Sequence, residues 1–96
     1  MKEYKVVCTV DTVNAKGETR HIKTTSPILS GSNRMHEVTT DIERAKRLLG
    51  EAQRKGAEYE EWTRKMAETY KDTSIITQTN YRILSREVTE WQEVKK

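Results

Sequence analysis

The segment Thr39–Lys55 constrains the fold of this chain most strongly, because its periodicity and both of its ends indicate the same structure. Thr40 and Glu43 form a capping-box pattern at its start, and Gly56 supplies a stop signal at its end. Apolar residues recur every three or four positions, which predicts an amphipathic helix with one face on a core. The apolar stripe consists of Ile42, Ala45, Leu48, Leu49 and Ala52.

A helical period resumes in residues 57–70, where large side chains again recur at helical spacing. Two interpretations stay open: a second helix after a kink at Gly56, or one continuous helix. Either geometry gathers the aromatic and Met side chains on one surface. Such residues are enriched at protein interfaces, so this surface is the candidate protein-interaction site, and the alternative is that they complete the core. These residues are Tyr59, Trp62, Met66 and Tyr70.

The first part of the chain predicts a β-hairpin. Tyr4–Val13 alternates in side-chain character and is rich in β-branched residues, which is typical of a strand. Asn14–Gly17 contains turn-forming residues, and Thr19–Thr25 then supplies a partner strand. Pro27 lacks a backbone N–H and is expected to end the pairing.

The tail 73–94 is also β-rich and has two interpretations. It forms either a hairpin about Asn80, or one long strand with a bulge or bend near Ser85, which we favour. Together the elements predict a single α+β domain over residues 1–96. Its small antiparallel sheet has the order β-β-α-α-β, with the last strand split in the hairpin alternative, and a helix packs on one face.

Composition limits the size of the core and the class of protein. Only 33% of the 96 residues are apolar and 34% are charged. The core must therefore be thin, and a homodimer would extend it. No apolar run reaches the length of roughly 18–20 residues that spans a bilayer, and the N-terminus lacks a signal-peptide pattern. The expectation is a cytoplasmic protein.

Catalytic and metal-binding patterns are weak in this sequence. A catalytic site would have to use Cys8, His21 and His36. Cys8 lies in an apolar alternating strand, where a cysteine is usually a small core residue. The two His residues lack the spacing of a zinc site, and no EF-hand loop occurs. We therefore predict no enzymatic activity, no metal and no cofactor.

Basic residues suggest an alternative function in nucleic-acid or nucleotide binding. The net charge is +3, although acidic residues alternate with basic ones almost throughout the chain. Arg34 and His36 lie beside a Gly-containing loop, and Arg82 and Arg86 share one face of the last strand. With Lys23, these residues are candidate contacts to an anion or a nucleic acid.

The C-terminal segment RILSREVTEWQEV resembles the closing strand of small uncharacterised proteins encoded by bacteriophages and prophages of Gram-positive bacteria. The hairpin and the DIERAKRLL helix resemble that group as well. The resemblance implies an accessory viral protein in the host cytoplasm, with no established active site to transfer. The leading hypothesis is therefore a small non-enzymatic protein that binds and modulates a host or phage protein.

Overall fold

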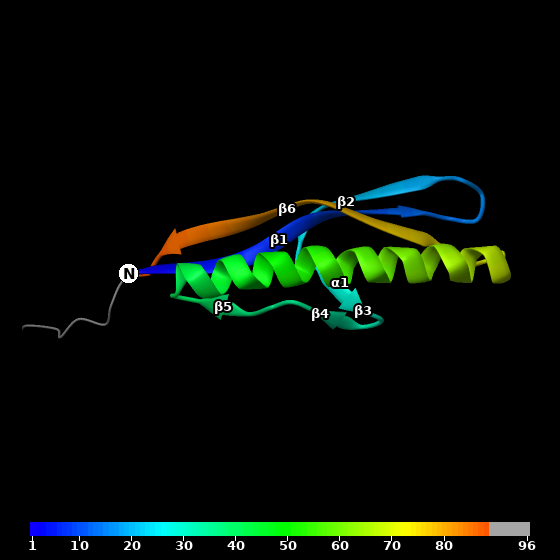
Figure 1. Cartoon of the computed structure of the whole chain (residues 1–96). Coiled ribbons are helices and arrows are strands. Elements are labelled where there is room, and N and C mark those ends of the chain that lie inside the picture. The colour runs from blue at the N-terminus through cyan, green and yellow to red at the C-terminus, as the bar shows by residue number, and fades with distance from the viewer. Residues whose placement is uncertain (89–96) are drawn as a thin grey trace, which may run out of the picture.

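The computed structural model describes residues 1–88, and for residues 21–23 it describes the backbone alone. A single long helix covers one face of an antiparallel sheet, so the predicted α+β class is confirmed (Figure 1). The described elements are β1 (Lys2–Val13), β2 (Thr19–Thr25), β3 (Ile28–Ser30), β4 (Asn33–Arg34), β5 (Val38–Thr39), α1 (Ile42–Thr69) and β6 (Ile75–Glu87).

Strand β1 is the centre of the main sheet, and all its neighbours run antiparallel to it. β6 pairs with one edge from Lys2 to Val13. The other edge is shared, with β2 pairing along Cys8–Val13 and β5 pairing at Tyr4–Lys5. β3 and β4 form a separate two-stranded hairpin. The alternation predicted for the first strand thus serves to direct every second side chain of β1 toward α1.

The predicted turn between β1 and β2 forms as expected. Gly17 has φ +81°, a conformation that glycine adopts at little cost, and its N–H donates to the Asn14 carbonyl at 2.9 Å. The Asn14 side chain accepts hydrogen bonds from the backbone N–H groups of Lys16 and Glu18. β2 ends at Thr25, two residues before Pro27, as its missing N–H predicts.

Strand β6 is one long strand and not a hairpin. The favoured bulge is present, but it lies at Asn80 instead of near Ser85. Between the pairs Val7–Arg82 and Thr9–Thr79, β6 contains one more residue than β1, and Asn80 takes φ +53°. Asparagine tolerates this left-handed conformation better than most residues. The part of the predicted tail beyond Val88 lies outside the described residues.

The predicted start of the helix was wrong, whereas the interpretation of one continuous helix through Gly56 is confirmed. The N-cap is Asp41, not Thr40: its side chain accepts a hydrogen bond from the Glu43 N–H at 2.9 Å. Gly56 does not end a helix, because α1 continues to Thr69 without interruption. Gly56 is buried against β6, and a β-carbon there would overlap the hydroxyl oxygen of Tyr81. The glycine therefore makes room for a side chain that comes from a distant strand.

Two small apolar clusters lie between α1 and the sheet. The first contains Val6, Met35, Leu48 and Ala52, and the second contains Cys8, Val10 and Ile28. Tyr81 packs against both clusters. The buried Gln78 joins the β3–β4 hairpin to the sheet, since its amide accepts from the Ile28 N–H at 2.7 Å and donates to the Ile28 carbonyl at 2.9 Å.

Candidate functional site

Trp62 and Tyr59 form a partly exposed aromatic pair on α1. Their rings stack with centroids 5.9 Å apart and an angle of 16° between the ring planes. Tyr59 is half-buried and packs against the cluster of Cys8, Val10 and Ile28. Trp62 retains 52% of its surface exposed. Tyr59 therefore belongs partly to the core, and it supports a tryptophan that faces solvent.

The other two predicted members of this surface differ in their placement. Met66 is half-buried, and its carbonyl accepts a hydrogen bond from the Tyr70 N–H at 2.7 Å. Tyr70 is the C-cap of α1 in an extended conformation and is 58% exposed. The four predicted residues therefore do not form one uniform surface. Tyr59 and Trp62 form a stacked pair, Met66 is half-buried, and Tyr70 lies at the end of the helix.

A hollow lies beside Trp62, between α1 and the tip of the β3–β4 hairpin. Its volume is about 340 Å³, and we call it the hairpin hollow. A second, more open hollow of about 420 Å³ lies on the other side of Trp62 and involves only α1. The hairpin hollow is lined by Leu29, Ser30, Gly31, Glu58, Tyr59 and Trp62. Its hairpin side was missed in the sequence, because no helical or strand period brings residues 29–31 next to residues 58–62.

The hairpin is held in place from two directions. Gln78 binds both backbone groups of Ile28, and the Met35 N–H donates to the Pro27 carbonyl at 2.9 Å. Gly31 turns the chain at the tip with φ +50°. Both walls of the hollow are therefore attached to the core, which gives a preformed binding surface.

Two of the predicted anion-binding residues meet near Ser26. The Arg34 guanidinium donates to the Thr25 hydroxyl at 3.3 Å and to the Ser26 carbonyl at 3.2 Å. The Nδ1 atom of His36 lies 3.2 Å from the Ser26 hydroxyl oxygen. Arg82 is near this group, since its guanidinium donates to the Thr24 hydroxyl at 2.5 Å and to the Asn80 carbonyl at 3.0 Å.

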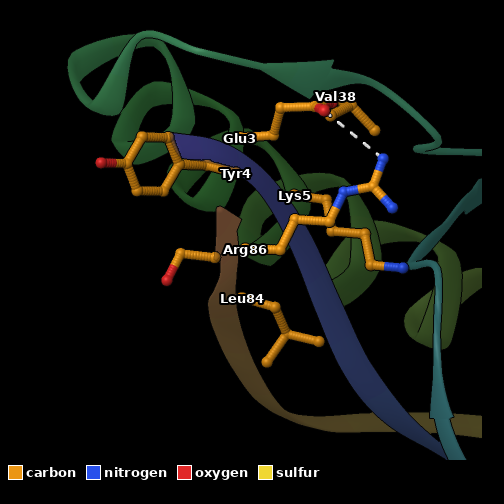
Figure 2. Close-up of a pocket in the computed structure, with 7 residues that line it drawn as sticks. Glu3, Tyr4, Lys5, Val38, Leu84 and Arg86 are labelled. Carbon is orange, nitrogen blue, oxygen red and sulfur yellow. Dashed lines mark hydrogen bonds and ion pairs between the residues drawn. The ribbon is translucent and has the colours of Figure 1, made fainter. Parts of the chain in front are cut away.

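Arg86 lies in a different part of the molecule. It lines a hollow of about 240 Å³ at the N-terminal end of β1, together with Glu3, Tyr4, Lys5, Val38, Leu84 and Ser85. Figure 2 shows the Arg86 guanidinium directed to the Glu3 carboxylate, at 3.4 Å. The four candidate residues therefore do not form one basic patch. Protein groups already accept hydrogen bonds from all three guanidinium groups, so this arrangement does not favour the nucleic-acid alternative.

Cys8 lies in the core and not at an accessible site. Its side chain is completely buried, and Sγ lies 3.4 Å from the Gln78 Oε1 atom. Burial raises the pKa of the Cys8 thiol, while the Arg34 and Arg82 guanidiniums act in the opposite direction. A buried thiol with a raised pKa lacks the properties of a reactive nucleophile. His36 is exposed, and the His21 side chain is not among those described.

Among the described side chains, no three His, Cys, Asp or Glu residues lie together in a way that would hold a metal ion. Within residues 1–88, no helix combines the length and the apolar character needed to cross a membrane. Comparison of the chain with protein-family models, curated proteins and solved structures found no match.

Proposed function

We propose that this chain is a small non-enzymatic interaction protein that binds and modulates a protein partner through Trp62 and the hairpin hollow. The observation that carries the proposal is the half-exposed Trp62 ring stacked on Tyr59. Tryptophan is the residue type most enriched among binding hot spots. In a chain with few large apolar residues, a tryptophan left outside the core is available for a partner.

The supporting ring of Tyr59 strengthens this interpretation. Ordering a mobile side chain on binding costs about 0.5–1.5 kcal/mol. Because Trp62 already stacks on a residue that packs against the core, part of that cost is paid during folding. The hollow beside the ring gives a partner side chain a place to insert. A preorganised ring next to a hollow is the usual geometry of a hot spot.

The proposal includes a phage or prophage origin and action in the cytoplasm of a bacterial host. The resemblance of the C-terminal segment supports this part. A homodimer is compatible with the same surface, and in that case the partner is a second copy of the chain. We expect sedimentation over a range of protein concentrations to distinguish a monomer from a dimer.

Capture of partners from a Gram-positive bacterial lysate tests the proposal. The tagged wild type is compared with Trp62→Ala and with Leu84→Ala, which removes a 38%-exposed apolar side chain from a different hollow. We expect a stoichiometric protein partner with the wild type and with Leu84→Ala, and its loss with Trp62→Ala. Capture of the same proteins by Trp62→Ala would contradict the proposal. Loss of all captured proteins after nuclease treatment would favour the nucleic-acid alternative.

A further inference from the structure

The Glu58 carboxylate lacks a basic partner in the described part of the chain, unlike several other carboxylates of α1. It is exposed, and it lines the hairpin hollow beside Trp62. Three other carboxylates of the helix form ion pairs within 3.3 Å, namely Glu43–Lys46, Glu51–Lys55 and Glu60–Arg64. The charge of Glu58 is therefore available to a ligand.

Glu61 provides a useful contrast. It also lies next to Trp62 and has no ion pair within residues 1–88, but it lines only the second hollow, which Glu58 lines too and where Lys65 is a neighbour. Lys65 reduces the local negative potential on that side. Because Lys65 does not line the hairpin hollow, the potential there is set by Glu58 among the lining residues.

The chemistry of the hairpin hollow matches a cationic side chain with an apolar stem. Leu29 and the ring of Tyr59 offer apolar surface, and the indole of Trp62 offers the ring type that attracts cations best. The Glu58 carboxylate then complements the charged end. We infer that the partner inserts an arginine or lysine side chain, from an apolar segment, between Trp62 and the β3–β4 hairpin; this inference rests on the proposed function.

A fluorescence titration tests this inference on the full-length chain. Trp91 lies outside the described residues, and replacing it by Phe makes Trp62 the only tryptophan reporter. The probe is a nine-residue peptide with one arginine flanked by leucines, and the control peptide contains neutral citrulline in its place. We expect the arginine peptide to bind roughly three-fold to twenty-fold more tightly, with the difference decreasing at high salt.

Glu58 lines both hollows and Glu61 lines only the second, so a variant of Glu61 shows whether the peptide occupies the second hollow. In the Trp91→Phe background, Glu58→Gln should weaken binding of the arginine peptide about two-fold to five-fold, whereas Glu61→Gln should leave the affinity nearly unchanged. Trp62→Leu keeps an apolar group but removes the aromatic face and the fluorescence reporter, so its affinity is measured by isothermal titration calorimetry, and binding should be weaker by about two-fold to five-fold. Circular dichroism of each variant checks that the fold is retained.

The two proposals fail in different ways. Equal affinity for the arginine and citrulline peptides, or equal effects of Glu58→Gln and Glu61→Gln, would overturn the inference about the cationic side chain. The proposed function would survive that result if Trp62→Ala still abolishes capture of a protein partner. If Trp62→Ala leaves capture unchanged, the proposed function fails, and the inference about the partner fails with it.

Discussion

Replacing Gly56 by alanine should destabilise the protein, although the same change in an ordinary helix is favourable. Alanine is preferred over glycine in a helix interior by about 1 kcal/mol. At Gly56, however, the added β-carbon would overlap the Tyr81 hydroxyl oxygen and lie 3.0 Å from Cζ of that ring. Tyr81 packs against both core clusters, so its ring cannot move away freely. Overpacking of this kind costs about 1–3 kcal/mol.

The chain contains a matched control within the same helix. Gly50 is exposed, and nothing lies within 4 Å of a β-carbon built there. Gly50→Ala should therefore raise the free energy of unfolding by about 0.5–1 kcal/mol, which corresponds to a few degrees in Tm. Gly56→Ala should instead lower the free energy of unfolding by up to about 2 kcal/mol, after the gain in helix propensity is subtracted from the overpacking cost. Thermal and urea unfolding followed by circular dichroism measure both changes.

A second substitution shows whether Tyr81 is the cause. Tyr81→Phe removes the oxygen that meets the new β-carbon, so the Gly56→Ala and Tyr81→Phe double variant should recover about 1 kcal/mol relative to additivity. Tyr81→Phe alone should cost little, since no hydrogen bond of this hydroxyl is found within residues 1–88. If Gly56→Ala stabilises the chain as much as Gly50→Ala does, the argument that Gly56 accommodates Tyr81 is refuted.

Three further predictions concern polar groups. Gln78→Leu leaves the buried backbone N–H and carbonyl of Ile28 without their acceptor and donor, and should lower the free energy of unfolding in urea by about 2–4 kcal/mol. Burial raises the pKa of the Tyr81 hydroxyl to about 12, so this group ionises in the unfolded state before it does in the folded state. The free energy of unfolding should therefore decline between pH 10 and 12. Urea titrations at each pH should show that Tyr81→Phe removes this part of the decline. The hydrogen-bonded Arg44 lowers the pKa of Glu37, so the pair stabilises the fold above pH 4.5 and loses this effect as the pH falls. Glu37→Gln should therefore lower Tm at pH 7, and its difference from the wild type should shrink steadily below pH 4.5.

The candidate site could be predicted from the sequence only in part. Helical spacing identified Tyr59 and Trp62 as neighbours on one side of a helix, which their stacked rings bear out. Spacing alone could not decide which ring enters the core, because this depends on the orientation of α1 over the sheet. Leu29 and Gly31 were missed as lining residues, since they approach Trp62 only after Gln78 attaches β3 to β6.

Local patterns in the sequence determined the elements that depend on nearby residues. The alternation of β1, the turn at Asn14–Gly17 and the buried apolar stripe from Ala45 to Ala52 all depend on backbone preferences and side-chain periods over a few positions. Ile42, the first residue of the predicted stripe, is instead exposed. The α+β class follows from the same short-range signals.

Only the tertiary structure decided the features that depend on contacts between distant residues. Gly56 is a stop signal by local rules, yet α1 continues through it because the glycine fits against Tyr81 from β6. Likewise, the bulge at Asn80 shifts the alternation of β6 so that Ile76 before it and Tyr81 after it both pack against the cluster of Cys8, Val10 and Ile28. Burying apolar side chains in a thin core stabilises the fold more than a local propensity of about 1 kcal/mol per residue. Long-range packing therefore overrides the local signal at both positions.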